Sequence, residues 1–477
     1  MEILPQDITP FSLPDLPLEL QDRISNYLPN NGVLNLASTC WTFSHFRALC
    51  TTLKFNSHNM PSEDELREYF LKYYNFHHHT ARKFEITEPP PYILGILANY
   101  PTITSISITC HHSISSSATP DQILESLTQL QHLPSLRQFS LQLGIRDVQE
   151  KDFQFLQYIS KVSELRLSSN CFMGIALFPA VISQFTNLKS LALEGWHQVK
   201  RTKVLSSLTR LTELSLANCT SLSELGGLAT LTNLSKLNLQ DIGRLVPLSP
   251  LTSLQQLKIL NLGSERQAGT LHPNMVPRLQ DNYGAVSKLA GLRDIKLNVW
   301  IPEMGTSLAG LTSLTSLHVE GEGKSINLNP ISEIPHITRL KLSLIRIPPS
   351  TVIPPTITEL CIQHAITENL IFLSPLTGLK SLTIGAMIVD DVKSPIPPLE
   401  IEVLHILISH HRILQELGPL PRLKSLFLSG MYLGPTEVQW ENYPSLSLLG
   451  MEWTDKYVRT RPPAHVNVVL QVPSTKW

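Results

Sequence analysis

The chain has 477 residues, a formal net charge of −1 and charged residues at 16% of its positions. Because this charge content is low and balanced, the sequence lacks the basic surface of a nucleic-acid-binding protein, and we expect no nucleic-acid partner. No run approaches about eighteen apolar residues and MEILPQDITPF lacks signal-peptide features, so we expect no membrane partner and a location in the cytoplasm, the nucleus or both.

The first 49 residues are predicted to form a short leader (1–12) and a small helical domain (13–49). Asp15 can cap a helix that begins at Leu16, and the turn residues 29–32 end it. Helical spacing continues over residues 33–40, and a third short helix is predicted around Phe46. Three helices in so few residues make a very small core, so this domain should rest on a partner or on the segment that follows it.

The order of apolar positions in this helical domain resembles an F-box. The opening Leu16-Pro17-Leu18-Glu19-Leu20 and the closing Cys40-Trp41-Thr42-Phe43 carry the likeness, although Asn30-Asn31 and Trp41 stand where the family often has an acidic and a basic residue. In that family, the F-box docks on a Skp-type adaptor and, through it, on a cullin. The resemblance implies adaptor-binding roles for Leu16, Pro17, Leu20, Ile24, Leu28, Leu34, Leu36, Cys40 and Phe43. The alternative is that these helices only cap the N-terminal edge of a repeat array.

Residues 50–80 are predicted to contain a linker helix and a first repeat. Ser62-Glu63-Asp64-Glu65 has the pattern of a helix start. His77-His78-His79 follows, but adjacent histidines cannot all reach one metal ion, and no HExxH or CxxC pattern accompanies them. We therefore expect these histidines, like His111-His112 and His410-His411, to be solvated, and we expect no metal site.

Residues 81–455 repeat one frame of apolar residues, LxxLxxLxxLxL. The frame is clearest from Leu225 to Leu239, where leucines lie three residues apart and finally two apart. The spacing of three predicts 3₁₀-like turns, and the spacing of two predicts a short strand with both leucines on one face. One such unit cannot bury its own apolar edge, so neighbouring copies must stack. Counted by their first apolar residue, the strand cores begin at Cys50, Ala81, Ile103, Leu136, Val162, Leu188, Leu211, Leu234, Leu254, Leu292, Leu314, Ile337, Ile357, Leu379, Ile401, Leu423 and Leu446.

From Lys161 onward this frame resembles the leucine-rich-repeat superfamily, in its class of about 22 residues per repeat. The resemblance implies an α/β solenoid, a horseshoe or arc with parallel β-strands on its concave face. Members usually have asparagine or cysteine three positions beyond the last strand leucine, where the side chain bonds the next turn. Asn170 and Cys219 keep that place here, whereas tryptophan or methionine replaces it at Trp196, Trp300, Met387 and Met431. We expect packing and backbone hydrogen bonds to hold those turns.

Two further segments complete the predicted organisation, an insert near residues 262–284 and a C-terminal cap at 456–477. The interval between the strands counted from Leu254 and from Leu292 is about sixteen residues too long. The earlier strand can also be counted from Leu257, which shortens the surplus. The insert is either a functional loop or an excursion without fixed structure, and the sequence favours neither.

The middle residue of each LxxLxL strand faces away from the core, so these residues should form one row on the concave face. In the later repeats the row consists of Lys296, His318, Lys341, Cys361, Thr383, His405 and Phe427, with Arg339 beside it. Earlier repeats offer small residues such as Ser190 and Ala192, which give a partner little to contact. Because interfaces favour arginine and aromatic anchors, we predict substrate-binding roles for Lys296, His318, Arg339, Lys341, His405 and Phe427. The alternative is an ordinary solvated face.

The sequence carries no catalytic pattern. Its six cysteines include no CxxC pair and are expected to be reduced thiols. Gly321-Glu322-Gly323-Lys324-Ser325 is similar to the end of a phosphate-binding loop, but His318 occupies the place of the first glycine. We therefore expect no enzyme activity and no cofactor.

Together, an F-box-like head and leucine-rich repeats resemble the substrate-recognition subunit of a Skp–cullin–F-box ubiquitin ligase. In that family the F-box binds the adaptor and the repeats bind the target protein, which brings a target lysine near the ubiquitin-charged enzyme. The alternative is a non-ligase interaction scaffold, whose repeats bind a partner and whose N-terminal helices only cap the array.

Overall fold

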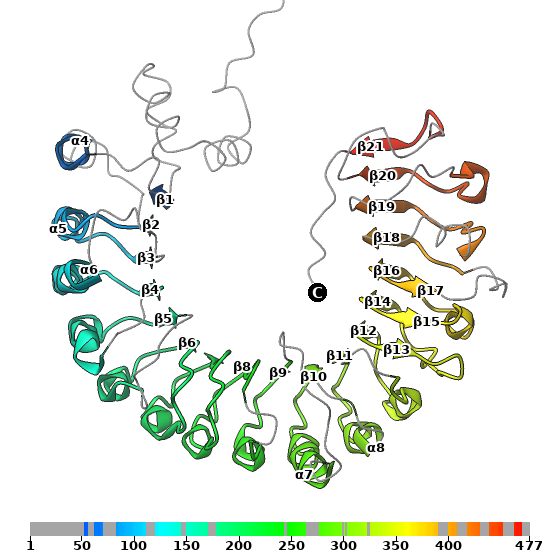
Figure 1. The fold of residues 1–477 in the computed structure, drawn as a ribbon, viewed down its shortest axis with the longest axis horizontal. Coiled ribbons are helices and arrows are strands. Elements are labelled where there is room, and N and C mark those ends of the chain that lie inside the picture. Colours follow the sequence, from blue (N-terminus) through cyan, green and yellow to red (C-terminus); the bar gives the residue numbers. More distant parts are fainter. Residues whose placement is uncertain are drawn as a thin grey trace, which may run out of the picture. The chain divides into compact units, whose positions relative to one another are not determined.

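The structure is a computed structural model. It describes residues 52–55, 62–69, 83–110, 120–144, 149–169, 178–242, 246–263, 276–297, 300, 303–321, 325–389, 399–407, 417–429, 438–451 and 462–469. The chain divides into two compact units, Met1–Leu222 and Ser223–Trp477. In each unit the strands of a parallel sheet lie on one side and short helices lie on the other (Figure 1).

The first unit builds its sheet from strands one repeat apart. These strands are β1 (Thr52–Phe55), β2 (Lys83–Thr87), β3 (Ser105–Cys110), β4 (Gln138–Leu143), β5 (Glu164–Ser169), β6 (Ser190–Glu194) and β7 (Glu213–Ser215). The helices, with η marking a 3₁₀ helix, are α4 (Glu63–Tyr69), α5 (Tyr92–Leu97), α6 (Pro120–Ser126), η4 (Leu127–His132), η5 (Glu150–Ile159), η6 (Ala180–Gln184) and η7 (Lys203–Ser207). Each strand pairs in parallel with the next, so equivalent apolar residues such as Phe139, Leu165 and Leu191 are aligned in the core.

The second unit continues the same arrangement and adds a small second sheet. Its main strands are β8 (Lys236–Asn238), β9 (Ile259–Leu262), β10 (Asp294–Leu297), β11 (Ser316–Glu320), β12 (Arg339–Ser343), β14 (Glu359–Gln363), β16 (Ser381–Gly385), β18 (Val403–Leu407), β19 (Ser425–Ser429), β20 (Leu448–Met451) and β21 (Asn467–Val469). Its helices are η8 (Gly226–Leu228), η9 (Ser249–Ser253), α7 (Val276–Val286), α8 (Glu303–Ala309), η11 (Asn329–Glu333), η12 (Ile371–Leu373) and η13 (Trp440–Asn442). The second sheet consists of β13 (Arg346–Ile347), β15 (Ile366–Thr367) and β17 (Ile388–Val389).

The leucine spacing of three forms consecutive tight turns, as predicted. The amide of Leu228 donates to the carbonyl of Leu225 over 2.8 Å, and the amides of Leu231 and Leu234 repeat this bond at 2.9 and 3.0 Å. The six leucines from Leu225 to Leu239 are each at most 1% exposed. Each fully buried leucine contributes about 1.5–3 kcal/mol relative to exposure, so the stacked leucines dominate the stability of this array. The fold is a leucine-rich-repeat solenoid.

A paired backbone hydrogen bond recurs where strands begin. The amides of Ser163 and Glu164 both donate to the carbonyl of Arg137, at 2.8 and 3.0 Å. In the second unit, the amides of Thr338 and Arg339 donate in the same way to Thr315, each at 3.0 Å. The hydroxyls of Ser163 and Thr338 donate to the same two carbonyls, at 3.2 and 3.3 Å, so backbone and side-chain bonds together fix each strand to the preceding repeat.

At three of the positions of the family asparagine the side chain donates to the backbone, whereas Met387 is buried at the equivalent place and has no donor. The indole of Trp196 donates to the carbonyl of Leu167 at 3.3 Å, and the thiol of Cys219 donates to Leu193 at 3.3 Å. The indole of Trp300 donates to the carbonyl of Asn327 at 2.8 Å. The turns therefore combine the backbone bonding that we expected with indole donors that the sequence pattern did not indicate.

The structure decides the register of the strand before the insert. The frame of β9 begins at Leu257 and not at Leu254, because Leu260 is buried and Ile259 is 40% exposed. The second half of the expected insert is the helix α7, in which Asn282 accepts from the amide of Leu248 at 3.0 Å and donates to the carbonyl of Val246 at 2.9 Å. The helix start at Ser62 is confirmed, since its amide donates to the Glu65 carboxylate at 2.8 Å.

Candidate functional site

The outward strand positions of the second unit form one continuous row, as the sequence indicated. Each member pairs with the next in the parallel register. The row, which we call the central row, consists of Asn261, Lys296, His318, Lys341, Cys361, Thr383, His405 and Phe427. Arg339 lies beside it at the first position of β12, next to Glu359 of β14.

The cations of the central row differ in how they are neutralised. Lys296 forms an ion pair with Glu320 at 3.2 Å, and both side chains are largely shielded, at 22% and 12% exposure. Arg339 is exposed and Lys341 is half-buried. Among the described residues, neither Arg339 nor Lys341 has an ion-pair partner within 4 Å. The available positive charge of this face is therefore concentrated on β12.

His318 lies between two lysines and is neutral at physiological pH. Burial, Lys296 and Lys341 together lower the pKa of the His318 imidazole to about 3, because each disfavours the charged form. Its Nε2 lies 3.2 Å from the hydroxyl oxygen of Ser343. His318 therefore serves as a hydrogen-bonding group between the cations and adds no third positive charge.

The other predicted contact residues are more buried than an exposed anchor would be. The rings of His405 and Phe427 stack with centroids 4.3 Å apart, and the two residues are 9% and 6% exposed. Cys361 and Thr383, next along the row, are also buried. Burial raises the pKa of the Cys361 thiol to about 11, so it is not a nucleophile at neutral pH. The accessible half of the central row therefore runs from Asn261 to Lys341.

Ile259 is a surface residue that sequence reasoning placed in the core. It occupies the first position of β9, between Lys236 of β8 and Asp294 of β10, and is 40% exposed. A single exposed aliphatic side chain is common on protein surfaces, so Ile259 gains weight only through its place on the same face as Arg339 and Lys341. Counting the strand from Leu257, which the sequence permitted, would have revealed it.

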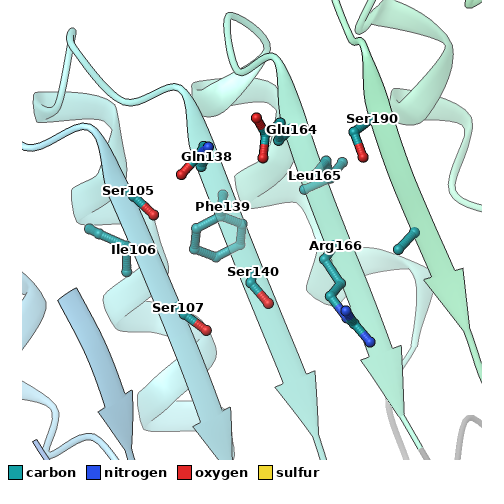
Figure 2. A pocket seen from close by; sticks show the side chains of 11 residues that line it. Ser105, Ile106, Ser107, Gln138, Phe139, Ser140, Glu164, Leu165, Arg166 and Ser190 are labelled. Atoms are coloured by element: carbon teal, nitrogen blue, oxygen red, sulfur yellow. The ribbon is translucent and has the colours of Figure 1, made fainter. Parts of the chain in front are cut away.

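The strand face of the first unit contains a hollow that the sequence did not suggest (Figure 2). The hollow has a volume of about 270 Å³ and extends across β3, β4, β5 and β6. Its polar lining comes from Ser105, Ser107, Gln138, Ser140, Glu164, Arg166 and Ser190. The register places Ser107, Ser140 and Arg166 side by side, and the short serine side chains leave the space open.

The remaining predicted features concern adaptor binding, metals and membranes. The adaptor-binding set from Leu16 to Phe43 lies outside the described residues, as do the histidine runs at 77–79, 111–112 and 410–411. The described residues contain no cluster of three or more potential metal ligands. Within the same part of the chain, no helix is long and apolar enough to span a bilayer.

Comparisons with known proteins lead to repeat proteins of low sequence identity. No protein-family model matches the sequence, and no curated protein matches it. A crystal structure of an internalin from Listeria monocytogenes is 21% identical, with 64% of this chain and 83% of that chain covered and a TM-score of 0.39. A leucine-rich-repeat protein from Leptospira interrogans is 16% identical, with 78% and 90% covered and a TM-score of 0.41. Internalin C2 from Listeria monocytogenes is 18% identical, with 48% and 83% covered and a TM-score of 0.29.

Proposed function

We propose that this chain is a non-catalytic binding protein that holds a protein target on the strand face of its second unit. The observation that carries the proposal is the aligned face from β9 to β12, where exposed Ile259, half-buried Lys341 and exposed Arg339 share one surface. Arginine is enriched at protein interfaces, and an aliphatic contact with a lysine at the polar rim complements it.

The charge of this face defines the chemistry of the target. Lys296 is neutralised by Glu320 and His318 is uncharged, so Arg339 and Lys341 are the groups available to bind carboxylates. Arginine binds a carboxylate through two parallel hydrogen bonds, whereas lysine acts as a point charge. The target segment should therefore carry an acidic residue for β12 and, about four residues away if the segment is extended across the strands, an apolar residue that contacts Ile259.

Charge reversal on β12 tests this proposal. Arg339→Glu combined with Lys341→Glu should reduce recovery of the target in affinity purification with mass spectrometry by at least tenfold, because attraction becomes repulsion at two contacts. The matched control is Lys288→Glu with Arg346→Glu, which makes the same charge change at two exposed positions away from the central row. Equal recovery by both double variants and the wild type would contradict the proposal.

A more specific role follows if the head at 13–49 is an F-box. The chain would then be the substrate-recognition subunit of a Skp–cullin–F-box ubiquitin ligase, working in the cytoplasm, the nucleus or both. The support is the order of residues from Leu16-Pro17 to Phe43. The receptor would act by proximity, raising the effective concentration of a target lysine near the charged enzyme. Co-purification of a Skp-type adaptor and a cullin separates this role from that of a scaffold without ligase partners.

A further inference from the structure

The hollow on the first unit is small and lies on an open strand face. Its volume of about 270 Å³ is below the roughly 300–1,000 Å³ of pockets that enclose a small-molecule ligand. It opens on a strand face, where an extended partner segment can lie across several repeats. We infer that this hollow receives a single basic side chain, an arginine or a lysine, from a protein partner that is bound along β3 to β6.

The charges in and beside the hollow favour a cation over an anion. Arg166 donates from Nη2 to the Glu194 carboxylate at 2.6 Å, and Glu194 also accepts from the Ser215 hydroxyl at 2.8 Å. The guanidinium charge is therefore neutralised on the side of β6. Glu164 is exposed, and within the described part of the chain its carboxylate forms no ion pair or side-chain hydrogen bond. Glu164, Glu194 and Arg166 together carry a net charge of −1. The register adds Lys83 and Glu85 beside Ser105 and Ser107, and Glu213 beside Ser190, so the net charge stays negative.

The neutral groups around Glu164 complete a set of hydrogen-bond acceptors. Ser105, Gln138, Glu164 and Ser190 share one row across the four strands, and Ser107 and Ser140 form the row beside it. Figure 2 shows the labelled serine hydroxyl groups and the Gln138 amide on the same face as Glu164. Hydroxyl and amide oxygens accept hydrogen bonds, and a guanidinium offers five donors in a planar fork. Arginine can therefore bond the carboxylate and a neighbouring oxygen at once.

Arg137, a cation near the hollow, does not occupy it. Arg137 comes immediately before β4, and its guanidinium donates to the carbonyls of Pro134 and Leu136 at 3.3 and 3.2 Å. These bonds hold it at the start of the strand, and it does not line the hollow. The inference is independent of the target site on β9 to β12, so the two can fail separately.

A titration with a charged peptide and its neutral counterpart tests the inference. The probe is a fluorescently labelled peptide of alternating serine and arginine, and the comparison peptide has citrulline in place of each arginine. Fluorescence anisotropy with the full chain should show at least tenfold weaker binding of the citrulline peptide, because citrulline keeps the shape but removes the charge. Wild-type protein that does not bind the arginine peptide, or that binds a serine–glutamate peptide equally well, would overturn the inference.

Three variants locate the binding to the hollow. Glu164→Gln should weaken binding of the arginine peptide about fivefold to tenfold, a modest effect because the carboxylate is exposed. Ser140→Phe should weaken it similarly by filling the hollow without changing charge. The control Glu125→Gln removes one charge from an exposed position on α6 and should bind as the wild type does. If Ser140→Phe lowers the melting temperature, Glu164→Gln decides the question, and wild-type affinity of that variant overturns the inference.

Discussion

At the scale of single residues, the charge that the strand face offers to a partner depends on which side chains are already neutralised within the chain. Lys296 with Glu320 and Arg166 with Glu194 are internal pairs, so they offer a partner less than their formal charge suggests. His318 shows the same principle by another route, since burial between two lysines keeps it neutral. The residues that can bind a partner are consequently fewer than the charged positions in the sequence.

The pH dependence of stability tests the environment of His318. Its folded pKa is about 3 against an ordinary value of 6.5, so between these values the unfolded chain binds a proton that the folded chain does not. The free energy of unfolding should therefore fall as pH decreases through this window, by at most about 1.4 kcal/mol per pH unit from this group. Urea denaturation at several pH values measures the slope, and His318→Gln should make it shallower. An unchanged slope in that variant would mean that His318 is not held neutral.

At the scale of one repeat, the buried leucines determine which strand residues face the core.

Residues with positive φ follow several strands, at Asn218, Asp241, Leu344, His364 and Ala386. At the corner after β6, Gly195 has φ +78°, and a Cβ there would lie 1.7 Å from the carbonyl oxygen of Ser169. Close approach of neighbouring repeats thus requires glycine at that position.

Two adjacent substitutions in β8 test the strand register. Leu237→Asp should lower the free energy of unfolding by more than about 3 kcal/mol, because it places a charge at a core position that is 1% exposed. Asn238→Asp should change it by less than about 0.5 kcal/mol, since the side chain faces outward and keeps the oxygen that accepts from the Gln240 amide at 3.1 Å. Thermal and chemical denaturation monitored by circular dichroism measure both variants. Similar losses for the two would show that the assigned register is wrong.

At the scale of the whole molecule, the roles proposed for the repeats and for the head can be tested separately. Repeat arrays derive their stability from contacts between neighbouring repeats, so a change in the head should leave the solenoid folded. The proposed target face belongs to the second unit, and the F-box-like residues precede the first described strand, β1. The proposed ligase role would therefore depend on residues distinct from those that would hold a target.

Substitution at the opening of the head tests the ligase role directly. Leu16→Ala with Pro17→Ala should abolish co-purification of a Skp-type adaptor, because the apolar residues of so small a domain must bury part of their surface against a partner. Target recovery and melting temperature should stay at wild-type values. Adaptor recovery at the wild-type level would refute the F-box assignment, and so would the absence of any adaptor with the wild-type chain.

The sequence alone determined the repeat and most of its register. The change from spacing three to spacing two fixes both the tight turns and the inward face of each strand, because those periods match only one arrangement of backbone hydrogen bonds. That pattern was enough to align Lys296, His318, Lys341 and their neighbours in one row. It was ambiguous at Leu254 and Leu257, where two leucines at the same spacing fit the frame equally well.

The tertiary structure decided how accessible each outward residue is. Outward position does not guarantee exposure, since stacking buries His405 and Phe427, and the ion pair with Glu320 shields Lys296. The tertiary structure also showed that small residues open a hollow, because Ser107 and Ser140 leave space that larger side chains would fill. Burial, pairing and empty volume depend on side chains from different repeats meeting in space, and a one-dimensional pattern does not contain those distances.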